Sequence, residues 1–318
     1  MEIGNTFICS IKDDKKAIIT FTFDDALYKP AIFFSSELSK RGLKGTFAIT
    51  TNFVRDSNGN DVNGTWEQWI NLINASKFDV ANHSKSHLDL TKLTPEELEE
   101  EINHARKILI SKFKGQKVLC MVNPFNATND VVDKKISEFH YAARNGIEGY
   151  NSISPPDKEW LRLNYKGIYH DTSATEMKKW IDESIKNNLW LIEMIHGVNG
   201  IGWEAAPDNV FRDHFDYVSS KKEEIWNATF EEATMYIREV QSTSINLKIE
   251  DRKVNVKLKN NLQPYFDYPL TLKTIVPNED IKLTSNGRYI PFNIKREENR
   301  IFVYYEAIPK RDDISILF

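Results

Sequence analysis

The sequence has 318 residues, of which 41% are hydrophobic and 12% aromatic, and its formal net charge is -4 at pH 7. A chain of this length can bury a sizeable core and exceeds the usual size of one domain. The charge balance excludes the basic surface that nucleic-acid binding requires, and no stretch approaches the roughly 18 to 20 apolar residues of a membrane-spanning helix.

Strand-like segments recur up to about residue 243. Short runs rich in apolar, β-branched and aromatic residues lie at 17–23, 45–49, 78–82, 117–122, 139–143, 189–195 and 223–230. Seven such runs, most of them followed by a helix-like segment, predict a parallel sheet with crossover helices. The sheet can be closed as a barrel or open and doubly wound.

Helix signals separate several of these strands. Thr65 is placed to cap a helix that begins at WEQWINLINAS, and an earlier helix is expected to end at the C-capping Gly42. The clearest start is TPEELEEEINHARKIL, with Thr94 as N-cap, Pro95 at the first helical position and Glu97 at the capping-box position. These signals place helices between the strands, as a crossover topology requires.

The pattern changes near residue 244. Alternating runs such as INLKIEDRKVNVKLKNN and NRIFVYYEAI are separated by turn signals, among them Asn286-Gly287. We therefore expect two domains, an α/β domain at 1–243 and a small antiparallel β-sandwich-like domain at 244–318. The second domain can bind glycan, cover a face of the first or mediate self-association, and its sequence leaves these alternatives open.

Unusual polar residues follow the strands of the first domain. Because the loops after parallel strands converge on one rim, reactive side chains are expected to gather there. The residues in such positions are Asp24 and Asp25 after the first strand, His83 after the third, Asn123-Pro124-Phe125 after the fourth, Arg144 after the fifth and His196 after the sixth. Together they predict a functional site at the carboxyl ends of the strands.

The segment NHSKSH contains a candidate metal-binding pair. His83 and His87 are spaced i, i+4, so a helical turn would put both imidazoles on one side. One of the two adjacent aspartates, Asp24 or Asp25, can add a carboxylate. Two histidines and one carboxylate leave coordination positions open, which is typical of a catalytic divalent metal. The ligand types suit Zn²⁺, and Co²⁺ or Ni²⁺ stay as alternatives.

These motifs resemble the polysaccharide deacetylases with a NodB-type homology domain. The first motif of that family, T-F-D-D, stands here at residues 22–25, and the second, H-[S/T]-x-x-H, stands at 83–87, followed by Leu90. A late histidine after an apolar strand stands in LIEMIHG as His196. The resemblance spans roughly residues 15–240. It implies a distorted (β/α)7 barrel that removes acetyl groups from N-acetylated or O-acetylated glycans.

The resemblance also implies a metal site and a general base. Asp25, His83 and His87 would bind one divalent metal ion, and Asp24 would stay unbound as general base. A metal polarises the acetyl carbonyl and lowers the pKa of a bound water, while a nearby carboxylate takes the proton as the water attacks.

The remaining roles follow from the same resemblance. The backbone N–H of Phe125 would help to hold the tetrahedral oxyanion. His196 would protonate the departing amine or alcohol. The apolar side chains before it, Leu191 and Met194 among them, would shape the pocket for the acetyl methyl group.

The sequence departs from the family pattern in two motifs. The third motif usually reads R-x-P-[Y/F] and supplies an arginine that pairs with the base, but MVNPFNAT has no arginine. Arg144 in YAARNG is expected to take its place. The fourth motif is only loosely matched by Asp171 and Trp180 in HDTSATEMKKW, for which a helix cap and a core aromatic are the alternatives. Trp203 is expected to be a sugar-stacking platform or a loop anchor.

Two other functions compete with deacetylation. The missing motif arginine and the added β domain are compatible with a glycan-binding protein that has lost turnover. A metal-dependent phosphoesterase would need a second metal or further basic groups, for which these motifs offer no ligands. The glycan itself, the choice between N- and O-deacetylation and the oligomeric state stay open.

The substrate class predicts an extracellular or periplasmic location. The N-terminal segment MEIGNTFICSIKDDKK lacks the basic start and apolar stretch of a secretory signal. Its Cys9, and Cys120 further along the chain, form neither a CxxC pair nor a disulfide framework, so both are expected to be buried thiols.

Overall fold

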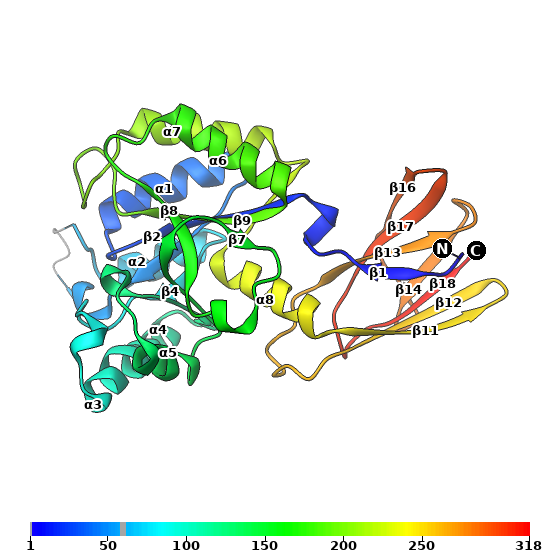
Figure 1. Cartoon of the computed structure of the whole chain (residues 1–318), viewed down its shortest axis with the longest axis horizontal. Coiled ribbons are helices and arrows are strands. Elements are labelled where there is room, and N and C mark those ends of the chain that lie inside the picture. The colour runs from blue at the N-terminus through cyan, green and yellow to red at the C-terminus, as the bar shows by residue number, and fades with distance from the viewer. Residues whose placement is uncertain (1, 58–61) are drawn as a thin grey trace. The chain divides into compact units, whose positions relative to one another are not determined.

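A computed structural model describes residues 2–57 and 62–318, whose contacts fall into two units (Figure 1). One unit is formed by residues 16–234 and the other by residues 1–15 together with 235–318. The N-terminal residues thus group with the C-terminal β strands. The domain boundary near residue 243 stays a prediction.

Seven parallel strands close into a barrel in residues 16–234. β2 hydrogen-bonds to β3 on one side and to β9 on the other, and this second pairing closes the ring. The strands of the ring are β2 (Ala17–Phe23), β3 (Thr46–Ile49), β4 (Asp79–Asn82), β5 (Cys120–Val122), β6 (Ala142–Glu148), β8 (Leu163–Ile168) and β9 (Leu189–Ile195). The expected distorted (β/α)7 barrel is confirmed.

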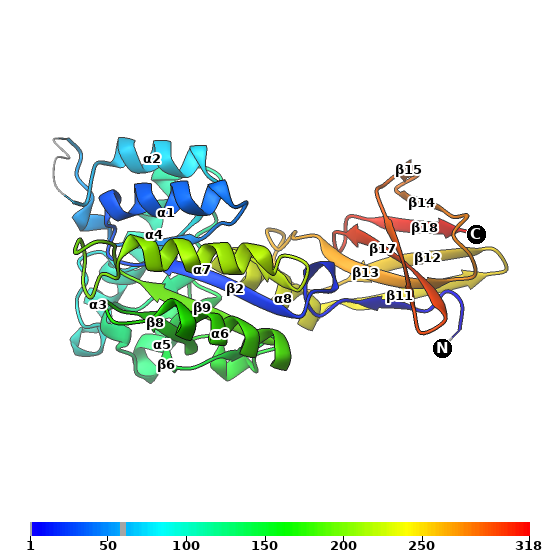
Figure 2. The same ribbon diagram turned by 90° about the horizontal axis from the view of Figure 1, so that it is seen from above.

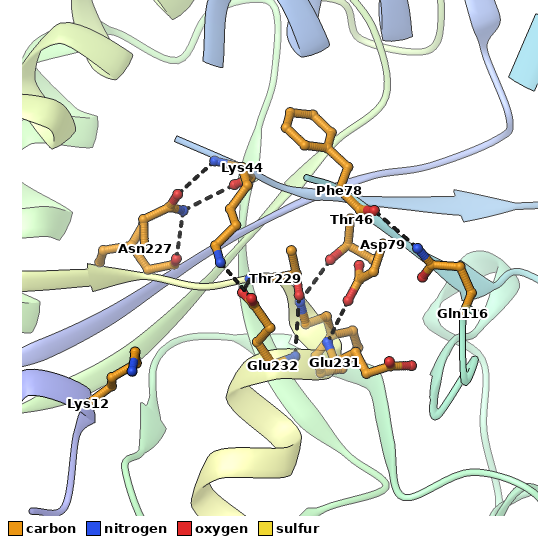
Figure 3. Close-up of polar contacts among 12 residues, drawn as sticks. Lys12, Lys44, Thr46, Phe78, Asp79, Gln116, Asn227, Thr229, Glu231 and Glu232 are labelled. Atoms are coloured by element: carbon orange, nitrogen blue, oxygen red, sulfur yellow. Dashed lines mark hydrogen bonds and ion pairs between the residues drawn. The ribbon is translucent and has the colours of Figure 1, made fainter. Parts of the chain in front are cut away.

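The membership of the ring differs from the sequence prediction at one strand. β8 was not expected, while the run predicted at 223–230 contains only the short β10 (Ile225–Asn227). β10 pairs with the start of β2, where β2 does not pair with β3. The Asn227 amide bridges the gap: it donates to Ile19 O and Lys44 O, both at 3.1 Å, and accepts from Lys44 N at 2.8 Å (Figure 3). β7 (Asn151–Ser152) adds to β9 in the antiparallel sense.

Helices cover the outside of the ring. Figure 2 shows α1, α6 and α7 beside β2 and β9. The α-helices are α1 (Tyr28–Lys40), α2 (Trp66–Ala75), α3 (Pro95–Leu98), α4 (Ala105–Lys112), α5 (Asp130–Ser137), α6 (Ala174–Asn187), α7 (Asp208–Ser220) and α8 (Phe230–Ser242). The π-helical segment η4 (Glu99–His104) joins α3 to α4. The 3₁₀ turns are η1 (Lys12–Asp14), η2 (Thr51–Phe53), η3 (Leu90–Lys92), η5 (Pro124–Asn126) and η6 (Asp157–Glu159).

The predicted caps are present. Thr65 and Thr94 each accept a hydrogen bond from the backbone N–H three residues on, and Gln68 and Glu97 complete the two capping boxes. Gly42 lies just beyond α1 with a φ of +68°.

The side chains of β2 alternate between the apolar core outside the ring and the interior of the barrel. Ala17, Ile19, Phe21 and Phe23 pack with the surrounding helices in the main apolar core. Thr20 and Thr22 alternate with them, so they face the interior, where Thr20 Oγ1 accepts from the buried Trp190 Nε1 at 3.0 Å. A side chain at position 24 continues this interior row.

The second unit consists of two antiparallel sheets. Their strand orders are β1-β13-β17-β16 and β11-β12-β18-β14-β15. The strands are β1 (Thr6–Ile8), β11 (Ser244–Glu250), β12 (Lys253–Lys259), β13 (Leu270–Val276), β14 (Lys282–Ser285), β15 (Arg288–Tyr289), β16 (Asn293–Glu297), β17 (Arg300–Ala307) and β18 (Asp313–Leu317). The antiparallel sheets expected in the C-terminal region are confirmed.

Local features of the sequence prediction also agree with the structure. Asn286 and Gly287 both have positive φ and join β14 to β15, as a tight hairpin requires. Cys9 and Cys120 are buried, and neither forms a disulfide within residues 2–57 and 62–318. No helix within the described parts of the chain has the length and apolarity to cross a membrane.

Candidate active site

β2 places two adjacent carboxylates at the rim of the barrel. Asp24 lies directly after the strand, is 3% exposed, and its N–H donates to Ile195 O at 2.9 Å. Because Asp24 continues the interior row of Thr20 and Thr22, its side chain lies in the barrel mouth. Asp25 follows with a φ of +69°, a conformation uncommon for a non-glycine residue, and the chain turns here. The two carboxylates therefore have different surroundings.

Arg144 is the cationic partner of Asp24. Its Nη2 donates to Asp24 Oδ2, and both side chains are almost fully buried. The sequence prediction placed Arg144 after a strand, but β6 continues to Glu148 and Arg144 lies inside it, level with Val122 at the end of β5. The guanidinium also lies over the ring of Tyr165, 5.4 Å from its centroid. Arg144 therefore reaches Asp24 from β6, a strand that does not pair with β2 in the ring.

Asp25, His83 and His87 form a compact cluster of metal-ligating atoms. The Nε2 atoms of His83 and His87 lie 3.3 and 3.2 Å from Asp25 Oδ1, and one donor atom from each residue lies within 4.8 Å of the others. The structure thus selects Asp25 over Asp24 as the carboxylate beside the two histidines.

The hydrogen bonds of His83 fix its orientation. Its Nδ1 lies 2.7 Å from Val122 O and must donate to it, which leaves Nε2 with a free lone pair in the neutral ring. Nε2 of His83 and Oδ1 of Asp25 are buried and, over residues 2–57 and 62–318, have no partner with hydrogen-bond geometry. Two buried atoms that can ligate a metal, and that have no hydrogen-bond partner, fit a divalent cation at this position.

The segment 83–87 is not the helical turn that the i, i+4 spacing suggested. It is an irregular loop in which Ser84 and His87 have φ values of +64° and +58°. A left-handed conformation at such residues costs about 1–3 kcal/mol each and persists only where the surroundings hold it. The Ser84 hydroxyl accepts from His87 N at 2.9 Å and closes the loop. This local folding, and not helix periodicity, brings the two imidazoles together.

His196 lies near the same oxygen of the Asp24 carboxylate that Arg144 binds. It follows β9, and its Nε2 is 3.8 Å from Asp24 Oδ2. The ring of Trp203 contacts His196 edge-on at 4.9 Å and is 56% exposed. Phe125, on η5, contacts His87 in the same way at 4.7 Å and is 68% exposed. Two exposed aromatic rings thus border the site.

Most of the predicted site residues line one cavity of about 490 Å³. They are Asp24, Asp25, His83, His87, Phe125, Arg144, His196 and Trp203, together with Asn123, Asn126, Tyr165, Tyr169 and Met194. Leu191 does not line this cavity, because it packs in the core between strand and helices. Trp180 belongs to the same core, and Ser173, not Asp171, caps α6.

Sequence reasoning missed two tyrosines of the cavity. Tyr165 lies on β8, and its hydroxyl accepts from Asn126 Nδ2 at 3.0 Å. Tyr169 follows the same strand and donates to Glu148 Oε1 at 3.0 Å. The alternation of Leu161, Leu163 and Tyr165 was a strand signal, although a glycine at 167 weakens it.

Electrostatics favour a cation in the cluster. Burial alone would raise the pKa of Asp25, but the two imidazoles outweigh it and hold that pKa well below its usual range. Burial alone would lower the pKa of His83, but the Asp25 and Asp24 carboxylates outweigh it and raise that pKa. For His196 burial dominates, so its pKa is lowered despite the same two carboxylates.

Comparison with known proteins adds one family match. Residues 11–143 match the family model described as polysaccharide deacetylase. No curated protein matches the chain significantly.

Solved structures of low sequence identity are similar to this chain. The Xyl-CE4 domain of a multidomain xylanase from the hindgut metagenome of Trinervitermes trinervoides has 17% identity and a TM-score of 0.47, with 69% of this chain and 89% of that chain covered. A family 4 carbohydrate esterase from Streptomyces lividans, in complex with acetate, has 15% identity and a TM-score of 0.46, with 67% and 93% covered. A CE4 family pseudoenzyme from Bacillus anthracis has 12% identity and a TM-score of 0.46, with 69% and 66% covered.

Proposed function

Since residues 11–143 belong to the polysaccharide deacetylase family, we propose that the protein is a metal-dependent hydrolase that removes acetyl groups from a glycan. One observation carries the proposal. The cluster of Asp25, His83 and His87 lies in the same cavity as the buried Asp24 and Arg144 pair and His196. A ligand set, a candidate base and a candidate acid around one cavity are what hydrolysis of an acetyl group needs.

Asp25, His83 and His87 would hold one divalent metal ion, with Zn²⁺ as the first choice for two imidazoles and a carboxylate. When bound, such an ion polarises a carbonyl oxygen and lowers the pKa of water. The bond from His83 Nδ1 to Val122 O supports this role, because it fixes the ring with Nε2 toward the cluster. Co²⁺ and Ni²⁺ are the alternatives that the ligand types allow.

Asp24 is the proposed general base. It is adjacent to the ligand Asp25, yet no histidine of the cluster contacts it in hydrogen-bond geometry, so its carboxylate stays available for a proton from the attacking water. The Arg144 guanidinium binds Asp24 Oδ2 and fixes the side chain, while Asp24 Oδ1 is buried and has no hydrogen-bond partner in the described part of the chain. We assign Arg144 the role of orienting this base.

His196 is the proposed proton donor to the departing amine or alcohol. Its lowered pKa makes the protonated ring a stronger acid than an ordinary imidazolium. The backbone N–H of Phe125 is the proposed oxyanion donor, and Met194 lies in the cavity where it can contact an acetyl methyl group. Trp203 and Phe125 offer exposed aromatic faces on which sugar rings can stack.

A release assay tests this function. The purified protein, loaded with Zn²⁺, is incubated with xylan acetate, N-acetylated peptidoglycan and chitin oligomers, and the released acetate is measured. Phosphorylated sugars are tested in parallel, and the released phosphate is measured. We expect acetate release from at least one acetylated glycan, and its loss with a chelator. Glycan binding without acetate release would identify a glycan-binding protein, and phosphate release without acetate would identify a phosphoesterase.

A further inference from the structure

The loop between the two proposed histidine ligands is held on its carbonyl side by η2 and the residue before it. Thr50 Oγ1 donates to His83 O at 2.9 Å. The backbone N–H groups of Thr51 and Asn52 donate to Ser84 O at 3.2 Å and to Lys85 O at 2.9 Å. Three successive carbonyl groups of the loop therefore have fixed partners.

The N–H side of the loop is held by one buried carboxylate. Glu101 Oε2 accepts from the backbone N–H groups of Lys85 at 3.1 Å and Ser86 at 2.8 Å. Glu101 is 5% exposed. Hydrogen bonds to an ionised acceptor are stronger than those between neutral groups, so these two bonds fix the centre of the loop.

Glu101 belongs to the π-helical segment η4, which makes a second contact with the same region. Ile102 O accepts from Asn82 Nδ2 at 2.8 Å, and Asn82 Oδ1 accepts from Ser84 N at 3.1 Å. Single π turns inside α-helices are frequent at functional sites. Here the π turn supplies successive residues that hold the segment around His83.

We propose that Glu101 is a positioning residue for the metal site, through the backbone of the loop 83–87. This inference rests on the metal site of the proposed function. Lys85 and Ser86 lie between Ser84 and His87, the two residues with left-handed backbone conformations. The Glu101 carboxylate holds the loop in that conformation, and so keeps the His87 imidazole beside Asp25 before a metal binds.

Metal affinity is the property that this arrangement controls. Without the carboxylate, the two N–H groups lose their acceptor and the loop must be reordered each time a metal binds. Loss of partners that orient metal ligands typically weakens affinity about 10- to 100-fold. We expect a loss of this size in Glu101→Ala, and a loss of roughly three- to tenfold in Glu101→Gln, whose neutral oxygen is a weaker acceptor.

The neighbouring Glu100 provides a matched control. Its Oε2 accepts from Nζ of the Lys85 side chain at 2.9 Å, and the Glu100 side chain is exposed while that of Lys85 is partly exposed. Glu100→Gln therefore removes the negative charge of an ion pair with the same loop residue but leaves the backbone bonds intact. We expect its metal affinity to equal that of the wild type.

The experiment measures the Zn²⁺ dissociation constant of the full chain by competition with a chromophoric chelator, and the thermal unfolding midpoint of each metal-free protein. Weaker binding in the order wild type, Glu101→Gln, Glu101→Ala, with Glu100→Gln unchanged, supports the proposal. Wild-type affinity in folded Glu101 variants overturns it, even if their unfolding midpoints fall. If Glu101→Ala does not fold, the affinity of Glu101→Gln decides.

The same titration separates this inference from the proposed function. A wild-type protein that binds Zn²⁺ with one equivalent, but whose Glu101 variants bind equally well, contradicts the positioning role alone. A wild-type protein that binds no Zn²⁺, Co²⁺ or Ni²⁺ contradicts the metal site itself and overturns both.

Discussion

Asp24 and Asp25 are neighbours in sequence but are surrounded by different groups. Asp24 is buried against the Arg144 guanidinium, while Asp25 lies beside the imidazoles of His83 and His87. The left-handed backbone at Asp25 turns the chain, so the side chains of Asp24 and Asp25 lie in different directions. One carboxylate is therefore placed to take a proton and the other to bind a cation.

Replacement of the proposed base tests this division. In Asp24→Asn the side chain keeps its size but loses its ability to accept a proton, so we expect the rate of acetate release to fall about 10²- to 10⁴-fold. The metal content, measured by elemental analysis, is expected to stay at the wild-type value because the ligands are untouched. Asp25→Asn is the matched variant, and it is expected to lose metal as well as activity. Equal metal loss in both variants would contradict the assignment.

Replacement of Arg144 tests its role as the partner of Asp24. Removal of one member of a buried ion pair leaves the other charge unpaired, so Arg144→Ala is expected to lower the free energy of unfolding by about 3–5 kcal/mol and to abolish turnover in the folded fraction. Metal content is expected to be retained. The control is Arg162→Ala, since Arg162 makes surface ion pairs with Asp130 and Asp133. Near-normal turnover in Arg144→Ala would refute the orienting role.

At the scale of elements, the turn after β9 positions the His196 and Trp203 pair. A Cβ at Gly197 would lie 1.8 Å from Ile201 O, so this glycine permits the close approach of the two ends of the turn. Val198 and Ile201 form a β-bridge across it, and Trp203 follows two residues after Ile201. The geometry of the turn thus decides where the Trp203 ring meets His196.

Gly197→Ala is therefore expected to displace the turn. We expect a loss of about 1–3 kcal/mol in the free energy of unfolding and a lower kcat/KM for glycan, because crowding must be relieved by backbone movement. Gly149→Ala is the control, since a Cβ there meets its nearest neighbour, Asn164 Nδ2, at an ordinary 3.5 Å. Thermal unfolding and acetate release report the two effects. Wild-type kcat/KM in Gly197→Ala would show that the turn does not position the site.

Elements with strong local signals could be predicted, and those fixed by tertiary contacts could not. The capping boxes at Thr65 and Thr94 depend on residues three apart, so the sequence alone locates them. β8 contains Gly167, which weakens its strand pattern, and it was missed. The run at 223–230 looks like a ring strand but fills a gap beside β2 through Asn227. The π turn at 99–104 has no sequence pattern distinct from that of an α-helix.

The candidate site was predictable for a related reason. Each motif follows a strand, and parallel strands end at one rim, so Asp24, His83 and His196 could be brought together without knowing the packing. The loop conformation at 83–87 could not, because the residues next to its left-handed positions are held by Thr50 and Glu101, which bond His83 and Ser86 from 33 and 15 residues away in the sequence.

At the scale of the whole molecule, a buried acid cluster lies at the other ends of the barrel strands. Asp79 begins β4, and its Oδ2 accepts from Glu231 N at 2.9 Å at the start of α8 (Figure 3). Glu231 Oε2 accepts from Leu119 N at 3.1 Å, just before β5. Burial raises the pKa of both carboxyl groups, and their proximity to each other or to Glu232 raises them further. The barrel therefore carries carboxyl groups that favour the protonated form when folded.

This cluster predicts a pH dependence of stability. A carboxyl group whose folded pKa is raised binds more protons in the folded than in the unfolded state, so its stabilising effect is present below the ordinary carboxyl pKa and is lost as the pH rises toward neutrality. Asp79→Asn removes this titration. We compare the free energy of unfolding of the variant with that of the wild type at each pH. This difference is expected to shift in favour of the variant by on the order of 1–3 kcal/mol as the pH rises from acidic to neutral.

Urea unfolding at a series of pH values measures this difference. Glu231 is partly exposed, so most of the effect is assigned to Asp79 and a smaller one is expected in Glu231→Gln. Glu67→Gln, at an exposed position on α2, serves as control and is expected to follow the wild type. A difference between Asp79→Asn and the wild type that does not change with pH would contradict the account of this cluster.

Metal-dependent removal of acetyl groups is the central claim, and a titration of activity with metal tests it most directly. The protein is freed of metal with a chelator, Zn²⁺ is added in fractions of an equivalent, and acetate release from an acetylated glycan is measured at each step. The Asp25, His83 and His87 cluster predicts no release without metal and a linear rise that levels off at one equivalent. Full acetate release by the metal-free protein, or none at any level of Zn²⁺, Co²⁺ or Ni²⁺, would contradict the claim.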